Sequence, residues 1–254
     1  MDERIERLKS ARAAMTVERW IWFVVGVFIN AFGIALITKA TLGTSPISSI
    51  PYVLSLEFPL SFGVTTFILN MAYIVAQAVL LRHNFKPFQW LQILVNIGFS
   101  ASIDLSMSVL SWFNPSFLPE DIISLLLGCA LLGFGVSIEV APNVLLVPGE
   151  GIVRAISTVT HRRIGSCKVV FDTTLVLIAV VLSFVFFGYL NGLGIGTIVS
   201  ALLVGNVVNF SNRYFPLTGH IVNLRIKCER ITDILNHEKK KRPGRKAEGV
   251  SVKS

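Results

Sequence analysis

Six apolar runs, separated by polar connections, organise the chain. Each holds roughly twenty residues with few charges, the length that an α-helix needs to cross the hydrocarbon core of a bilayer. The runs are residues 20–38, 62–81, 88–110, 122–141, 169–187 and 192–210. This pattern predicts an all-α membrane protein with six transmembrane helices.

The charges in the connections set the expected orientation. Lysine and arginine crowd the segment before the first run, recur at residues 82–86 and 162–168, and return after the last run, where eleven basic residues face four acidic ones from Arg213 onward. The three other connections are poor in positive charge. Because cytoplasmic loops carry the excess of Lys and Arg, the alternation predicts that both termini are cytoplasmic.

Composition agrees with this class and narrows the partners. Hydrophobic side chains make up 53% of the 254 residues and charged ones 15%, while the formal net charge is +8. A basic tail beside a membrane indicates contact with anionic lipid rather than with nucleic acid. The three cysteines form no CxxC pair, and the four histidines fall in connections or the tail. We therefore expect no metal site and no cofactor.

The two halves of the membrane region resemble each other at an offset of 102 residues. Gly33 aligns with Gly135, and Pro46 aligns with Pro148, each proline lying after one run and before the next. Three runs per copy is an odd number, so the second copy enters the membrane from the opposite side. We expect inverted repeats at residues 20–113 and 114–214, a design typical of secondary transporters, flanked by a cytoplasmic N-terminal segment (1–19) and a basic tail (215–254). Chance similarity between membrane helices is the alternative.

Each copy contains a short segment that begins at a proline. Ser45 or Thr44 suits a helix N-cap and Pro46 the first helical position, and Pro148 begins a similar segment. Such helices are too short to span the bilayer, and they present backbone N–H groups to a solute at membrane depth or lie at the interface. The candidate substrate-binding residues are Thr44, Ser45, Ser48, Glu150 and Arg154. In the alternative interpretation these are surface loops, and Glu150 with Arg154 is an ordinary i,i+4 ion pair.

Ionisable and amide side chains inside apolar runs form a second set of candidates. Their insertion into a bilayer costs several kcal/mol, so they mark functional positions by default. The candidates for ion or proton coupling are Asp104, Asn209, Glu139 and Asp172. Asp104 near the end of the third run parallels Asn209 near the end of the sixth. In the alternative interpretation, Asp104 and Asn209 form hydrogen bonds between helices, and Glu139 and Asp172 lie at the membrane interface.

Three motifs carry a resemblance to a known family. They are Leu42-Gly43-Thr44-Ser45-Pro46, Pro148-Gly149-Glu150-Gly151, and the segment from Gly194 to Gly205. The chain resembles the YczE/YyaS/YitT family of bacterial membrane proteins over roughly residues 20–214, and is closer to the branch without a soluble C-terminal domain. The resemblance implies six spans and a bacterial inner-membrane location, and it carries over no binding residue.

Three classes of function compete. The leading hypothesis is a permease for a small anionic or zwitterionic solute, working by alternating access. The second is a scaffold, sensor or assembly factor that docks through its basic tail, where residues 221–235 have apolar positions at near-helical spacing. An enzyme is not expected, because no run contains a histidine to activate a serine. The pattern leaves homo-oligomerisation open.

Overall fold

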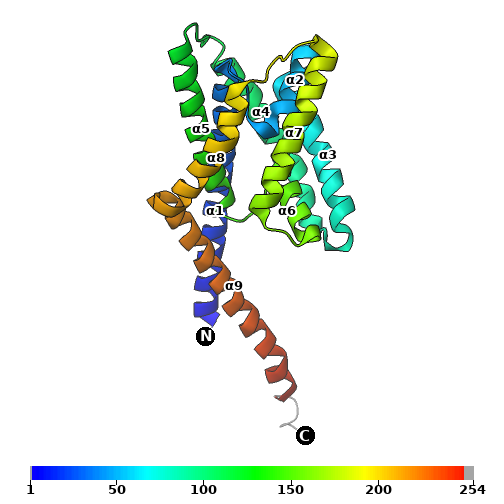
Figure 1. The fold of residues 1–254 in the computed structure, drawn as a ribbon. Helices are drawn as coiled ribbons and strands as arrows, with labels where there is room; N and C mark the ends of the chain where they lie inside the picture. The colour runs from blue at the N-terminus through cyan, green and yellow to red at the C-terminus, as the bar shows by residue number, and fades with distance from the viewer. Residues whose placement is uncertain (1, 249–254) are drawn as a thin grey trace.

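The computed structural model describes residues 2–248. Figure 1 shows long helices that run roughly along one axis, with the start of the first helix and the end of the last at the same end of the bundle, below called the termini side. The helices are α1 (Asp2–Lys39), η1 (Pro46–Ser48), α2 (Ser49–Glu57), α3 (Phe62–Leu81), η2 (Arg82–Asn84), η3 (Pro87–Leu91), α4 (Gln92–Val109), α5 (Leu118–Val140), α6 (Pro148–Thr160), α7 (Ile164–Phe187), α8 (Ile195–Tyr214) and α9 (Pro216–Glu248).

The prediction of six spans is confirmed. Within residues 2–248, six helices are long and apolar enough to cross a membrane: α1, α3, the η3–α4 segment, α5, α7 and α8. α3 has the predicted bounds, whereas α5 and α7 begin several residues earlier than the apolar runs. Helix ends extend into polar sequence because the backbone hydrogen bonds continue past the point where hydrophobicity stops.

α1 and α5 form the tightest helix pair, and glycines at their interface allow the two backbones to approach closely. A Cβ added to Gly33 would lie 2.5 Å from the backbone nitrogen of Leu132, and one added to Gly135 would lie 2.5 Å from that of Asn30. Gly26 meets Glu139 in the same way. The contacts pair rising with falling residue numbers, so the helices are antiparallel. Small residues allow this close approach, which gives dispersion contact where lipid offers no hydrophobic drive.

The remaining helices are arranged around this pair. α4 packs on α1 and α8 packs on α5, while α2 packs on α7 and α3 packs on α6. In Figure 1, α8 therefore lies beside α5, whereas α7 stands with α2, α3 and α6 on the other side of the molecule. α3 also packs along α4. Between α7 and α8, which are described in full, no comparable packing exists.

The basic tail begins as a helix that docks on its own chain. α9 packs against the first half of α1, with Cys228 Sγ 3.7 Å from Thr16 Oγ1 and His220 Nε2 3.4 Å from Glu18 Oε1. Ile221 and Leu235 are buried. The helical spacing expected for residues 221–235 is thus present, and α1 covers much of its apolar face.

Candidate functional site

Both proline-started segments form short helices, as predicted. Ser45 is extended (φ −70°, ψ 151°) and Pro46 opens η1, which continues into α2. Val147 is likewise extended (φ −61°, ψ 151°) before Pro148 opens α6. Proline fixes φ near the helical value and lacks only an N–H that the first turn would leave unpaired, so it begins a helix without cost.

The two segments meet inside the molecule. The end of the Ile47 side chain in η1 lies where a Cβ on Gly149 in α6 would be, so the glycine lets the two segments approach closely. Gln77 of α3 supports the start of α6, because its Nε2 donates to the carbonyl oxygen of Pro148 at 3.2 Å. The first turns of both helices therefore border the same space.

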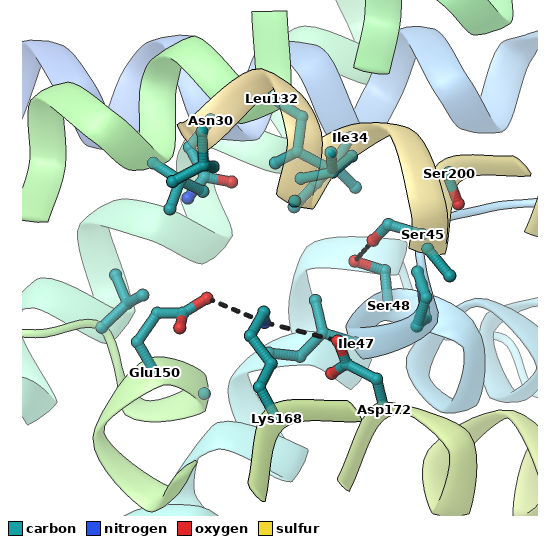
Figure 2. A pocket seen from close by; sticks show the side chains of 18 of the residues that line it. Asn30, Ile34, Ser45, Ile47, Ser48, Leu132, Glu150, Lys168, Asp172 and Ser200 are labelled. Carbon is teal, nitrogen blue, oxygen red and sulfur yellow. Dashed lines mark hydrogen bonds and ion pairs between the residues drawn. The ribbon is translucent and has the colours of Figure 1, made fainter. Parts of the chain in front are cut away.

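That space is a cavity of about 520 Å³. Figure 2 shows Asn30 and Ile34 of α1 and Leu132 of α5 on one side of it, with Glu150, Lys168 and Asp172 on the other. The first half of α7 and the second half of α8 also line it, through residues from Ile164 to Asp172 and from Ser200 to Asn212. These half-helices lie toward the termini side (Figure 1), so the cavity extends from the interior toward that end of the bundle.

Three charged side chains form the polar centre of the cavity wall. Lys168 Nζ lies 3.3 Å from Glu150 Oε1 and 3.4 Å from Asp172 Oδ2, and both carboxylate side chains are 19% exposed. Figure 2 shows the lysine between the two acids. The proline at the start of α6 and the i,i+4 spacing of residues 168 and 172 on α7 bring the three together. In such a setting, ion pairs are much less screened than at a protein surface.

Ser45 and Ser48 complete the polar lining on the η1 side. Ser45 Oγ donates to Ser48 Oγ at 2.9 Å, and both side chains border the cavity while being almost wholly buried. Thr44 is next to Ser45 in the chain but does not line the cavity. Its hydroxyl lies 2.8 Å from that of Thr38, and its N–H donates to Thr197 Oγ1 at 3.2 Å, so it ties the segment to α8.

The structure separates the predicted candidates. It brings Ser45, Ser48, Glu150 and Asp172 to one cavity, together with Asn209. Arg154 is exposed and lies outside the lining, one turn beyond Glu150. Sequence reasoning missed Lys168 as a site residue because it counted among the basic residues of the connection before α7. Its four-residue spacing from Asp172, at the start of an apolar run, was the available signal.

Glu139 lies beside the cavity without lining it. Its side chain is fully buried, Asn30 Nδ2 donates to its Oε2 at 2.8 Å, and the N–H of Val147 donates to its Oε1 at 3.4 Å. Asn30 and Val147 both border the cavity. Glu139 thus fixes the residue that caps α6 against the α1–α5 pair, and a buried acidic group of this kind depends on those hydrogen bonds.

Asp104 and Asn209, which parallel each other in the sequence, have different surroundings. Asp104 lies outside the cavity and holds the start of α3: Ser61 Oγ donates to its Oδ2 at 2.6 Å and the N–H of Gly63 donates to its Oδ1 at 2.7 Å. Asn209 is exposed and lines the cavity. The position on α4 is part of a helix interface, and the position on α8 is open.

These features define a multi-pass α-helical membrane protein with a charged cavity among its spans. Residues 17–213 match a family model described as "Family of unknown function (DUF6198)", and the chain belongs to that family. It is similar to "Uncharacterized membrane protein YczE" of Bacillus subtilis (strain 168), with 28% identity over 77% of this chain and 86% of the relative. It is also similar to "Uncharacterized protein YyaS" of the same organism, with 26% identity over 75% and 90%.

The matched region contains all six apolar runs and both proline-started segments. The resemblance to the YczE and YyaS proteins is therefore confirmed over the part of the chain that bears the motifs. No solved structure matches the chain.

Proposed function

We propose that this protein is a permease that moves a small charged solute across a bacterial cytoplasmic membrane by alternating access. The observation that carries the proposal is the charged cavity of about 520 Å³, which both proline-started segments border. Ionisable groups at membrane depth are costly and mark substrate or ion pathways. Discontinuous helices that meet in the interior are the usual site of solute binding in secondary transporters.

The α1–α5 contacts support an inverted repeat. Adding 102 to Gly33 gives Gly135, and adding 102 to Asn30 gives Leu132. Gly33 contacts Leu132, and Gly135 contacts Asn30. Exchange of the two proposed repeats therefore converts one contact into the other, as a two-fold axis in the membrane plane requires.

A second pair of contacts obeys the same exchange. Gly26 meets Glu139, and Gly128 meets Ile37, again with partners 102 residues apart. Helix neighbours follow suit, because α4 packs on α1 as α8 packs on α5, and α3 packs on α6 as α7 packs on α2. Chance similarity in composition gives no reason for contacts to exchange in this way.

The charge of the connections supports the orientation. The termini side carries the basic connections 82–86 and 162–168 and the basic tail, which under the positive-inside rule supports a cytoplasmic location for this side. The cavity extends toward this side. At the other end, the N–H of Gly196 donates to the carbonyl oxygen of Leu42 at 2.8 Å, which joins the η1 segment to the start of α8. The arrangement corresponds to an inward-facing state.

The roles of the residues follow from their places. Ser45 and Ser48 offer hydroxyl groups from one repeat, and Glu150 offers a carboxylate from the other. Lys168 and Asp172 add opposite charges from α7. Because Lys168 has two acidic partners, a charged group of the substrate that takes its place at one carboxylate leaves the lysine paired with the other.

Uptake by the purified protein in liposomes tests the proposal. Vesicles with and without the full chain are incubated with a mixture of bacterial metabolites, and mass spectrometry identifies solutes that accumulate only with the protein. Glu150→Gln and Ser45→Ala are expected to reduce that accumulation by about tenfold or more, since each removes a polar contact inside the cavity.

Glu57→Gln is the matched control, because Glu57 is an exposed carboxylate at the end of α2 outside the cavity lining. It is expected to transport like the unaltered protein. Accumulation that is equal in the Glu150→Gln and unaltered proteins would reject the cavity as the transport site. The absence of any protein-dependent solute would reject the permease.

A further inference from the structure

The three charges of the cavity have an uneven balance that specifies the charge of the solute. Of the residues that line the cavity, the ionisable ones are Glu150, Lys168 and Asp172. One lysine therefore faces two carboxylates, and both acids lie within 3.4 Å of the same ammonium nitrogen. The site holds one negative charge more than it can pair from within.

We infer that the solute carries a protonated amine on an apolar body, and that this ammonium pairs with the carboxylates of Glu150 and Asp172 in competition with Lys168. The inference rests on the proposed transport function and names the class of its substrate. It replaces the anionic solute suggested by the helix N-termini with a cationic or zwitterionic one.

Hydrogen-bonding capacity supports the amine. Asp172 Oδ2 faces Lys168, but Asp172 Oδ1 is buried without a hydrogen-bond partner among the described residues. A buried acceptor without a donor costs about 1–3 kcal/mol. An ammonium supplies up to three donors and no acceptor, so it meets the need of a site rich in carboxylate oxygens. A second carboxylate from the solute would add acceptors and repulsion instead.

The rest of the wall selects an apolar body. Ile34, Leu132, Val136 and Val204 line the cavity opposite or beside the charged group. Its size of about 520 Å³ lies within the range of about 300–1,000 Å³ typical of small-molecule sites. An amine with an aromatic or branched aliphatic group fills such a space while its ammonium stays at the acidic wall.

The position of the cavity between α7 and α8 suits an amphiphile. Both helices line it, yet they do not pack on each other, and Val169 and Leu202 beside it are mostly exposed. Lipid covers such apolar surface in a bilayer. A solute that partitions into the membrane therefore reaches the cavity from the side, between these two helices.

Three compounds with one apolar body test the charge. Phenethylamine has only the ammonium, phenylalanine has both charges, and 3-phenylpropionate has only the carboxylate. Binding to the purified full chain is measured by calorimetry and by thermal stabilisation. We expect the amine or the amino acid to bind about tenfold or more tightly than the acid, since a charge partner in a poorly hydrated site is worth at least this factor.

The Lys168→Met variant distinguishes most clearly between an ammonium and an anion as the ligand, because it is expected to change their affinities in opposite directions. If the site recognises an ammonium, removal of the competing lysine leaves two carboxylates for the ligand, and amine affinity rises. If the site recognises an anion, the same change abolishes binding. Lys86→Met, at an exposed lysine outside the cavity, is the control that leaves binding unchanged. Asp172→Asn is expected to weaken amine binding by about tenfold.

Each of the following results would overturn a different part of the proposal. Preferred binding of 3-phenylpropionate, lost in Lys168→Met, overturns the amine and leaves a permease with an anion site. Amine binding that Asp172→Asn, Glu150→Gln and Lys168→Met all leave unchanged overturns the assignment of the cavity. If none of the three compounds binds while liposome uptake still finds a solute altered by Glu150→Gln, the amine is rejected and the transport proposal survives.

Discussion

The α3–α4 and α7–α8 pairs occupy corresponding places in the two proposed repeats, yet only the first pair is closed. Gly63 contacts the carbonyl oxygen of Ser100 and the carboxylate of Asp104, and Asn70 Nδ2 donates across the interface to Asn96 Oδ1 at 2.8 Å. Farther along, Gln77 and Gln92 exchange hydrogen bonds at 3.1 and 3.2 Å. Polar contacts thus fasten the α3–α4 interface along its whole length.

The α7–α8 pair has the same ingredients without the contacts. Gly165 is the second residue of α7, as Gly63 is of α3, but a Cβ added there would meet nothing within 4 Å. The same is true of Gly205 on α8. Asn209, which parallels Asp104, is exposed on the cavity wall. The α3–α4 interface is closed at both ends of the bundle, whereas α7 and α8 are apart at the termini side.

Alternating access would produce this difference between the α3–α4 and α7–α8 pairs, because only one of the two pairs is closed in each state. An inverted repeat reaches its second state when the two copies exchange conformations. In that state, α7 packs on α8 through Gly165 and Asn209, and α3 separates from α4. If the protein works by alternating access as proposed, Asp104 and Asn209 are alternative gate contacts, and experiments on either pair of helices test this role.

The largest difference in stability is expected between valine substitutions at the corresponding glycines Gly63 and Gly165. Gly63→Val places a side chain against the α4 backbone and is expected to lower the free energy of unfolding by about 3 kcal/mol, since a packed interface cannot admit new atoms. Gly165→Val meets open space and is expected to change it by less than about 0.5 kcal/mol. Thermal unfolding of both variants in the same detergent measures the difference. Equal destabilisation would mean that α7 is packed as tightly as α3.

The distance between the helices gives the second prediction. A disulfide needs Cα atoms within about 7 Å, so an Asn70→Cys/Asn96→Cys pair, whose native side chains are hydrogen-bonded, is expected to cross-link about tenfold or more faster than a Val169→Cys/Gly205→Cys pair. Mobility on a gel after timed oxidation gives both rates. The background lacks the three native thiols, which are all buried and unpaired: Cys129, Cys167 and Cys228.

Slow but complete cross-linking of the α7–α8 pair is the expected result, because the closed state is visited and then trapped. Equal cross-linking rates for the two pairs would contradict the conclusion that α7 and α8 lie farther apart than α3 and α4. A pair on α7 and α8 that never forms a disulfide would contradict closure of this side.

The sequence was sufficient to predict the spans, because each depends on local length and hydrophobicity, and it located both short helices from their prolines. Glu150 and Asp172 were found as charges in apolar surroundings. The sequence did not reveal that they share Lys168, since the three come together only when α6 folds against α7. It also could not separate Asp104 from Asn209, whose different contacts depend on which pair of helices is closed.

The smallest effect on stability is expected from alanine substitutions that distinguish the structural contact of Asp104 from the open position of Asn209. Asp104→Ala removes the acceptor for the Ser61 hydroxyl and the Gly63 N–H, and it is expected to lower the free energy of unfolding by about 1 kcal/mol, as loss of a helix cap does. Asn209→Ala is expected to stay within about 0.5 kcal/mol, because an exposed side chain loses little. Both are read as shifts in unfolding temperature. The reverse order would assign the structural contact to α8 and place the closed gate on the termini side.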